Sequence, residues 1–478
     1  MEDAIKTKAA HGVIWSAFQR FSSQGIGFII SIILARLLLP GDYGIVSLSL
    51  VFLAIFRTIN ESGFSLALIN KQDRDELDYS SVLVINVLIG CVLYLLLFLT
   101  ADSISYFFNQ PRLSGVLKII GICTIIDGFS IVQVAIFTIS VNFKIQARVS
   151  IIAVIISGLT GIFCAYNGYA FWALVIQSLI YSLVNTTLLW YYSTWRPRRL
   201  VFSFERIRSL FDFSYKLVLA RLINTIFIQL YPVVIGRVFS VELLGLFDKA
   251  KQFETQTSNN IANVVMRVSI PLMCEVQDSK ERLNEVLAKF IKATSFLVFP
   301  LLTGMIVLAY PLVIVVLSEK WVEAAWILQV LCPTGMFYII STFNINIFNA
   351  TGRTGLALQS EVIKKIIFIL FIFLSINLGF KYLVWAQLLT SLIEMIVSML
   401  YTKKQIGTGL LNQILSIKNV IISSFIMGGV VSIVTSYIDL NIFKLIVGFL
   451  CGCIVYFLYW FIVEPKYLYS IVTIFKKK

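Results

Sequence analysis

Long apolar runs separated by short polar breaks dominate the chain from residue 13 to its C-terminal end. About twenty apolar residues in a helix are needed to cross the roughly 30 Å of hydrocarbon in a bilayer, and runs of this length recur. The pattern therefore predicts about fourteen membrane-spanning helices. We expect them near residues 12–38, 42–68, 78–101, 112–139, 147–166, 169–193, 210–238, 242–270, 285–317, 323–350, 355–378, 381–401, 417–437 and 441–463.

The composition indicates the same class. Hydrophobic residues make up 59% of the 478 residues and charged residues only 13%, with a mean hydropathy of +0.90. In a soluble domain about 25% of residues are charged, so we expect an all-α, multi-pass integral membrane protein. The net charge of +14 would suggest a nucleic-acid partner in a soluble protein. In a membrane protein it marks the cytoplasmic face instead, and no nucleic-acid partner is expected.

Basic residues are concentrated in every second loop, and this pattern predicts the topology. Cytoplasmic loops of membrane proteins are enriched in lysine and arginine. One face of this chain carries only Arg112, Lys320, Lys381 and Lys444, so we expect the other face, with both termini, to be cytoplasmic. The residues on that basic face are Lys6, Lys8, Lys71, Arg74, Lys144, Arg148, Arg196, Arg198, Arg199, Arg206, Arg208, Lys280, Arg282, Arg353, Lys403, Lys404, Lys418 and Lys476 to Lys478.

The segment 242–270 is the most polar of the predicted spans, because it contains Asp248, Lys249, Lys251, Glu254 and Asn259. The topology nevertheless requires it to cross. If it did not, the basic loops at 196–208 and 280–289 would lie on opposite faces of the membrane. We therefore predict a spanning helix with one polar face.

The chain repeats itself at an offset of 201 residues. Three pairs share this spacing: Arg20 and Arg221, Arg36 and Arg237, Gly44 and Gly245 (221 − 20 = 237 − 36 = 245 − 44 = 201). Many transporters consist of two such repeats with the substrate site between them. The spacing predicts two six-helix lobes related by a pseudo-two-fold axis, residues 1–200 and 201–405, followed by an extra helix pair at 406–478.

Charged and polar side chains inside the helices are the candidate site. A charge in hydrocarbon is costly, so such residues normally face a bundle interior and mark a substrate path. The basic ones predict an anionic cargo. We expect Arg20, Arg57, Arg221 and Arg267 to line a cavity, together with a polar stripe on segment 242–270 that contains Gln252, Gln256, Asn259 and Asn263.

A further set of charged residues is predicted to take part in coupling or gating: Glu61, Asp127, Asp248, Glu254, Glu394, Arg36 and Arg237. Structural alternatives stay open for several of them. Arg57 and Glu61 are four residues apart on one helix and can pair, and Arg36 can extend toward the headgroups. The carboxylates Asp127, Glu254 and Glu394 can pair with nearby lysines.

Two absences from the sequence narrow the chemistry. The chain has no G-x-x-x-x-G-K-[ST] phosphate loop, so it carries no ATPase of that type. Its one histidine, His11, lies at the start of the first predicted helix, which excludes a histidine relay or a histidine metal site. We expect no cofactor and no metal, and the sequence leaves open whether protons or sodium ions drive transport.

Four short segments resemble polysaccharide-export flippases. The stretch Ala35-Arg36-Leu37-Leu38-Leu39-Pro40-Gly41-Asp42-Tyr43-Gly44 is similar to the first-loop signature of these proteins. Asn60–Ser65, Ser318–Trp321 and Asn349–Arg353 resemble family segments at the same places. The resemblance is to the Wzx-like branch of the multidrug/oligosaccharidyl-lipid/polysaccharide exporter superfamily, which includes the lipid II flippase and MATE transporters. Fourteen helices fit its colanic-acid and teichuronic-acid exporter subgroup.

The resemblance implies a flippase in the bacterial cytoplasmic (inner) membrane. Its cargo would be an undecaprenyl-pyrophosphate-linked oligosaccharide, moved between leaflets by alternating access for O-antigen, capsule or exopolysaccharide assembly. Arginines would then hold the pyrophosphate through forked hydrogen bonds, and the amides would hold sugars. The implied partners are this lipid-linked oligosaccharide, membrane lipids, and a polymerase and chain-length regulator of the same pathway.

Two other classes are weighed against the flippase. A MATE-like antiporter of small organic cations would need an acidic lining, whereas the candidate site is basic. An integral-membrane glycosyltransferase or polymerase would need catalytic groups in a sizeable segment outside the membrane, and the outer turns are short. We therefore expect a transporter and no enzyme.

Overall fold

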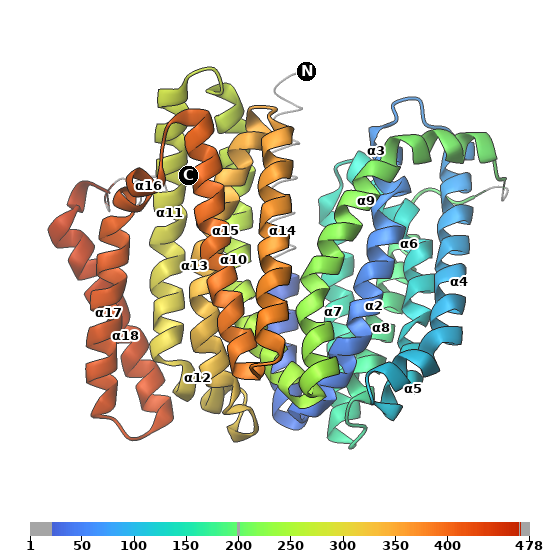
Figure 1. The fold of residues 1–478 in the computed structure, drawn as a ribbon. Helices are drawn as coiled ribbons and strands as arrows, with labels where there is room; N and C mark the ends of the chain where they lie inside the picture. The colour runs from blue at the N-terminus through green and yellow to red at the C-terminus, as the bar shows by residue number, and fades with distance from the viewer. Residues whose placement is uncertain (1–21, 198–200, 468, 470–478) are drawn as a thin grey trace. The chain divides into compact units, whose positions relative to one another are not determined.

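The structure is a computed structural model that describes residues 22–197, 201–467 and 469, without the side chains of Glu61, Ser62, Phe213 and Thr354. All regular elements in these ranges are helices. The chain divides into two compact units, Met1–Gly245 and Leu246–Lys478, and each is described by itself (Figure 1).

The first unit contains the helix Ser22–Leu37, followed by α2 (Pro40–Ser62), α3 (Phe64–Asn70), α4 (Glu76–Phe107), α5 (Pro111–Ile120), α6 (Ile122–Ile139), α7 (Phe143–Tyr166), α8 (Trp172–Tyr192), α9 (Phe204–Val234) and the π-helix η1 (Ile235–Phe239). Helix α10 (Val241–Glu275) begins in this unit and continues into the second. The second unit then contains α11 (Lys280–Val307), α12 (Ala309–Val316), the short 3-10 helix η2 (Glu319–Trp321), α13 (Ala324–Ala350), α14 (Thr354–Ile376), α15 (Phe380–Ile406), α16 (Leu410–Ser416), α17 (Lys418–Ser436) and α18 (Asn441–Val463).

The predicted fold class is confirmed, and every predicted span falls on a helix as far as the chain is described. Among the described residues, 11 helices are long and apolar enough to cross a membrane. Three predicted spans are not among these. The helix Ser22–Leu37 is described for only part of its predicted length, and α10 and α14 each carry several charged residues.

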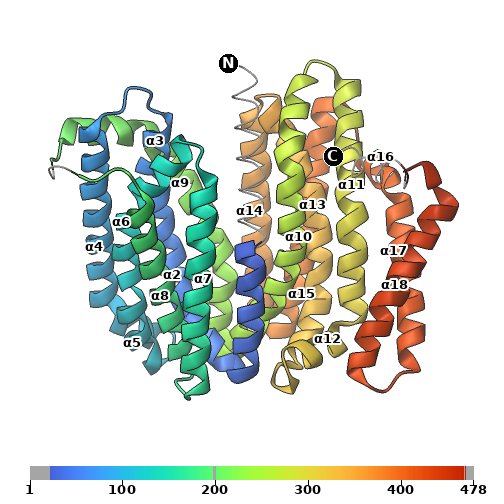
Figure 2. The ribbon, with the colours of Figure 1, turned by 180° about the vertical axis from the view of Figure 1, so that it is seen from behind.

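Close helix packing holds the first unit together. Helix α4 packs against α5 and α6, α6 against α8, and α8 against α7, an arrangement that can be followed in Figure 2. Gly90 of α4 and Gly128 of α6 bring two backbones together: a Cβ on Gly90 would lie 2.9 Å from the carbonyl oxygen of Thr124, and one on Gly128 would lie 3.0 Å from that of Asn86. Small residues permit such close approach between membrane helices.

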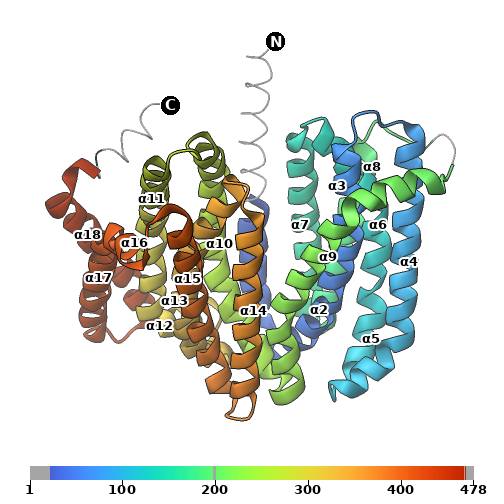
Figure 3. The same ribbon diagram turned by 45° about the horizontal axis from the view of Figure 1, so that its top comes forward.

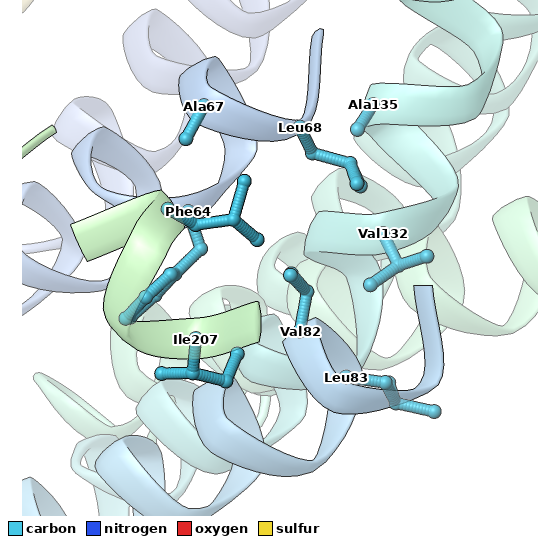
Figure 4. Close-up of a cluster of buried hydrophobic side chains, with 9 residues drawn as sticks. Phe64, Ala67, Leu68, Val82, Leu83, Val132, Ala135 and Ile207 are labelled. Atoms are coloured by element: carbon cyan, nitrogen blue, oxygen red, sulfur yellow. The ribbon is translucent and has the colours of Figure 1, made fainter. Parts of the chain in front are cut away.

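Helix α9 starts on the surface of the first unit and then turns down along it, as Figure 3 shows. Its first turns are fixed by a hydrophobic cluster, drawn in Figure 4. In this cluster Ile207 and Leu210 of α9 pack with Phe64 and Leu68 of α3 and with Val82 of α4. The start of α9 is therefore anchored to the first unit, and its spanning part packs against α2.

Polar contacts reinforce this anchor at the start of α4. The backbone N–H groups of Val201 and Ser203 donate to the hydroxyls of Ser80 and Ser81 at 3.1 and 3.0 Å. Asp75 accepts hydrogen bonds from the backbone of Asp78 and from Arg206, which hold the pKa of Asp75 below its usual value. By packing, α9 thus belongs to the first unit, although the repeat aligns it with the second predicted lobe. The boundary at residue 200 was predicted from the repeat, and it stays a prediction.

Helix α13 is central to the second unit, where it packs against α11 and α15. Buried polar side chains connect α13 to α15 and to α16 within the apolar interior. Ser341 and Ser398 share a hydrogen bond of 2.8 Å between α13 and α15. Asn344 and Gln413 exchange two hydrogen bonds of 2.8 and 2.9 Å, which tie α16 to α13. Buried amides with such partners are satisfied and fix the relative position of the two helices.

The C-terminal pair α17 and α18 is part of the second unit and packs against α11. Tyr456 of α18 donates to the carbonyl oxygen of Phe296 in α11 at 2.8 Å. Lys292 of α11 forms a 2.6 Å ion pair with Glu464, and its Nζ lies 4.3 Å from the centre of the Tyr467 ring. This pair is therefore held by specific contacts as well as by apolar packing.

We expect α10 to cross the membrane despite its polar face. Its 35 residues span about 52 Å at about 1.5 Å per residue, which exceeds the roughly 30 Å of hydrocarbon. The test uses single cysteines at the exposed positions Val238 and Asp278, in a chain whose seven native cysteines have been replaced. Membrane-impermeant thiol reagents should label the two positions from opposite faces. Labelling of both from the same face would show that the predicted topology is wrong.

Candidate functional site

An arginine–carboxylate pair connects helices of the first unit. Arg57 of α2 donates from Nε to Oδ2 of Asp127 in α6 at 2.9 Å. Ser182 of α8 donates to the other carboxylate oxygen, so three helices meet at Asp127. The side chain of Arg57 keeps 38% of its surface exposed. The guanidinium is therefore held in one direction while remaining accessible, as an anion-binding arginine requires.

This pair differs from the pairings that the sequence suggested. Asp127 was expected to pair with a lysine if it had a structural partner, and its partner is an arginine. The alternative pairing of Arg57 with Glu61 concerns a side chain outside the described part of the chain. The spacing of residues within one helix could not show the pair with Asp127, because its partners are 70 residues apart.

Arg221 lies on α9, which packs against α2, the helix that carries Arg57. Its side chain is exposed on α9, one helical turn before Thr225. The hydroxyl of Thr225 is 3.0 Å from that of Thr58 in α2, and Thr58 follows Arg57 in the chain. The structure thus places Arg57 and Arg221 in the same unit. Arg20, the predicted counterpart of Arg221, lies outside the described residues.

The predicted polar stripe on α10 stays out of the packed interior. Asp248, Gln252, Gln256, Asn259 and Asn263 are half-buried, and Arg267 is exposed. Two of the amides are already hydrogen-bonded: Gln252 accepts from Lys249 at 3.2 Å, and Gln256 accepts from Asn260 at 2.8 Å. These hydrogen bonds partly fix the orientation of the two amides, so the stripe can offer oriented polar groups to a ligand.

The buried face of α10 is more polar than the sequence suggested. Of the apolar residues Phe253, Ile261 and Val264, which lie away from the predicted polar stripe, only Phe253 is buried, and Val264 is 40% exposed. Glu254 and Ser258 are buried instead. Gly335 of α13 makes room for them, since a Cβ there would lie 3.0 Å from the Cβ of Ser258 and would overlap the Glu254 carboxylate.

Glu254 has a lysine partner, which is the structural alternative that the sequence left open. Lys251 forms a 2.7 Å ion pair with it, and Ser258 donates to its carboxylate at 2.8 Å. Glu394 of α15 is half-buried, and the charges that act on it include those of Lys364, Lys365 and Lys251. Both predicted carboxylates therefore lie among cations. Their part in coupling stays a prediction.

Arg36 and Arg237 are both exposed. Arg36 lies near the end of the helix Ser22–Leu37. The guanidinium carbon of Arg237, in η1, lies 4.8 Å from the centre of the Phe107 ring at the end of α4. This cation–π contact holds η1 against the end of α4. The gating role of Arg36 and Arg237 stays a prediction.

One charged cluster was missed by the sequence analysis. Lys364 of α14 is almost fully buried; it pairs with Glu361 at 3.0 Å and approaches the hydroxyl of Ser341 at 3.5 Å. The rule that charges inside spanning helices are functional or paired would have identified it within the predicted span 355–378. Ser182 gave no comparable signal, because a serine in an apolar helix is common. Within the described residues, no group of three or more His, Cys, Asp and Glu side chains could hold a metal ion.

Comparison with known proteins places these features in a family. A family model for polysaccharide biosynthesis proteins matches residues 33–326, which is more than half of the chain. The lipopolysaccharide biosynthesis protein WzxC of Escherichia coli (strain K12) is 24% identical over 372 residues, covering 77% of this chain and 75% of that protein.

Solved structures show the same fold. The lipid II flippase MurJ in an inward closed conformation superposes with a TM-score of 0.74 at 17% identity, covering 95% of this chain and all of that one. An inward-facing MATE-family multidrug transporter gives a TM-score of 0.62 at 15% identity over 80% of this chain and 94% of its own. At these identities the likeness is one of fold alone, and it confirms the predicted fold class.

We expect Arg57 and Asp127 to be energetically coupled. Removing one partner of a semi-buried pair leaves the other charge unsatisfied, so Arg57→Ala and Asp127→Ala should each lower the thermal stability of the purified protein. The double variant should lose less than the sum of the two, with a coupling energy of about 1–3 kcal/mol. Ser182→Ala, which removes a single hydroxyl donor, is the matched control and should cost less. Additive losses in the double variant would contradict the pairing.

Proposed function

Because the chain belongs to the polysaccharide biosynthesis protein family, we propose that it is a flippase for an undecaprenyl-pyrophosphate-linked oligosaccharide. It would carry this lipid from the cytoplasmic to the periplasmic leaflet of the bacterial inner membrane by alternating access, with both termini in the cytoplasm. The product would feed O-antigen, capsule or exopolysaccharide assembly. A polymerase and a chain-length regulator would then act on it.

The observation that carries this proposal is the set of accessible arginines within the helices. Arg57 and Arg221 lie on adjacent helices of the first unit and both retain exposed surface, and Arg267 is exposed on α10. Arginines at membrane depth are costly and normally mark a substrate path. A pyrophosphate presents concentrated negative charge, and guanidinium groups bind phosphate oxygens through paired, charge-assisted hydrogen bonds.

The remaining parts of the cargo also find matching chemistry. Sugar hydroxyls require amides and hydroxyls as partners, and the α10 stripe offers Gln252, Gln256, Asn259 and Asn263 outside the packed interior. The polyprenyl tail needs no polar site, because it can remain in the hydrocarbon. We infer that the headgroup enters the protein while the tail stays in the bilayer.

The charge distribution favours this cargo over a small organic cation. An exporter of cations would need carboxylates available to the cargo. Here Asp127 is paired with Arg57 and Glu254 with Lys251, whereas Arg57, Arg221 and Arg267 keep exposed surface. We accordingly rank the MATE-like antiporter second, although such transporters share the fold.

We propose a transporter without enzymatic activity. The helices follow one another closely along the described chain, and the connections between them are short. A glycosyltransferase or polymerase would need a sizeable extramembrane segment to hold catalytic groups. We expect no cofactor, and the driving ion would be a proton or a sodium ion.

A strain that lacks this protein and any second flippase tests the proposal. It should keep the lipid-linked oligosaccharide on the cytoplasmic leaflet and lose the corresponding surface polymer. The measurement is the fraction of the lipid-linked oligosaccharide that an impermeant glycosidase can reach in spheroplasts. This fraction should fall close to zero and return on complementation with the intact gene. Normal surface polymer in the deletion strain would sink the assignment.

A further inference from the structure

The start of α9 lies across one end of the first unit before the helix turns along it (Figure 1). The part of α9 that is long and apolar enough to cross a membrane begins only at Ser214. Residues 201–213 precede it and include the first turns of the helix. We call them the entry segment. Their side chains form three stripes with three different surroundings.

One stripe holds the entry segment to the protein. Ile207 and Leu210 are buried in the hydrophobic cluster with α3 and α4, and Ser214, a further turn along, is also buried. On the flank of this stripe Arg206 pairs with Asp75 at 3.2 Å. These contacts fix the rotation of the helix about its own axis, so the directions of the other two stripes are defined.

A second stripe is aromatic and exposed. Phe204, Arg208 and Phe211 are spaced i, i+4 and i+7, which places them on one side of the helix. Phe204 is 71% exposed and Phe211 51% exposed, and Val201 and Phe202 add to the exposed apolar surface with 45% each. Grouped exposed apolar side chains of this kind mark a contact with a membrane or with another protein.

A third stripe is polar. Glu205, Ser209 and Asp212 have the same spacing and are all exposed. Each of them directly follows a residue of the aromatic stripe in the chain, so the two stripes lie about 100° apart around the helix. An aromatic stripe beside a polar one is the pattern of a helix that lies in the plane of the membrane surface, with its apolar side toward the acyl chains.

Aromatic residues beside the entry segment indicate the same depth. Tyr79, Trp190 and Trp195 pack against the hydrophobic cluster that contains Ile207 and Leu210. The ring centre of Trp195 lies 5.7 Å from that of Tyr79 and 6.2 Å from that of Trp190. Tryptophan and tyrosine are enriched where the hydrocarbon meets the headgroups. This group is independent of the three stripes, and it indicates that the entry segment lies at that boundary.

The region around the entry segment is positively charged. Residues 196–208 contain five arginines and one acidic residue. Arg206 is already held by a carboxylate, and Arg196 donates to a backbone carbonyl oxygen. Among the described residues, the exposed Arg208 has no hydrogen-bond or ion-pair partner. Ser203 already caps the helix, so the available charge is that of Arg208 and not that of the helix end.

We propose that the entry segment is a membrane-surface site for an anionic phospholipid. Phe204 and Phe211 insert at the boundary between headgroups and acyl chains, and Arg208, between them on the same stripe, binds the phosphate of the headgroup. Its guanidinium can form paired hydrogen bonds with phosphate oxygens, and its apolar stem can lie along apolar surface. The predicted topology assigns the site to the cytoplasmic leaflet. The inference goes beyond the proposed function, because this lipid is a component of the membrane and not the cargo.

Spin labels on two neighbouring residues test the depth of the segment. A nitroxide is attached to a single cysteine at Phe211 or at Asp212, in the full chain with its seven native cysteines replaced, in nanodiscs of phosphatidylglycerol and phosphatidylcholine. The label at Phe211 should collide mainly with oxygen, which concentrates in the bilayer, and the label at Asp212 mainly with a water-soluble nickel complex. Phe204→Ser should raise nickel access at Phe211, because it removes an apolar anchor. Tyr106→Ser is the matched control: its side chain is 85% exposed near the far end of α4, and it should change neither label.

A short-range fluorescence measurement tests the headgroup. Bimane on a single cysteine at Ser209 should be quenched by nitroxide-labelled phosphatidylglycerol at lower concentrations than by equally labelled phosphatidylcholine. Arg208→Gln should weaken quenching by phosphatidylglycerol about fivefold, which corresponds to the roughly 1 kcal/mol that one basic residue contributes near an anionic surface. Arg208→Lys keeps the charge and should keep most of the preference. Lys381→Gln, at an exposed lysine of α15, is the charge-matched control and should have no effect.

The proposal fails if the nickel complex reaches Phe211 and Asp212 equally, because the aromatic stripe then lies in water. It also fails if the label at Phe211 is shielded from both oxygen and nickel, because protein then covers the stripe. Equal quenching by the two lipids, or unchanged quenching in Arg208→Gln, would rule out the headgroup site. Neither experiment uses the cargo, so both report on the entry segment even if the proposed cargo is wrong.

Discussion

Hydrocarbon does not solvate charge, and the pairing of several charged side chains inside the described helices follows from this constraint. Asp127 and Glu254 are held by Arg57 and Lys251, and the buried Lys364 is held by Glu361. Internal pairs of this kind remove the cost of an isolated ion. Arg221 and Arg267 are exposed within their helices. Under the proposed function, these arginines would meet the anionic headgroup of the cargo.

The cost of placing charge in hydrocarbon also links the fold to the proposed transport cycle. The proposed cargo, a lipid-linked oligosaccharide, can cross only if its polar headgroup is shielded, so the proposed cycle opens the protein to one side at a time. In the first unit, Gly44 of α2 meets Val241 of α10, and Gly245 of α10 meets Pro40 of α2. These two helices therefore meet through residues that the 201-residue repeat makes equivalent.

The sequence predicted the helices well, because apolar length decides whether a segment spans. Helix α10, whose hydropathy is low, lies where the distribution of basic loops predicted a helix, and its crossing of the membrane stays a prediction. The sequence could not predict the Arg57–Asp127 pair, because helical spacing relates only residues of the same helix. The sequence also did not predict that α9 packs with the first unit. The repeat shows only that α9 is equivalent to the first predicted helix, whereas the contacts of Ile207, Leu210 and Arg206 show where α9 lies. Lys364 could have been found by applying the rule for intramembrane charges to every predicted span.

The most direct test of the central claim is flipping by the purified protein in vesicles that contain a labelled undecaprenyl-pyrophosphate oligosaccharide. An impermeant glycosidase reports the fraction of headgroups on the accessible leaflet. Hydrogen bonds to charged groups contribute about 1.5–3 kcal/mol each, so Arg221→Ala should weaken cargo binding at least about tenfold. Arg221→Lys should retain part of the activity, because it keeps the charge and loses the fork. Unaltered flipping per folded molecule in Arg221→Ala, or none in the wild-type protein, would contradict the account.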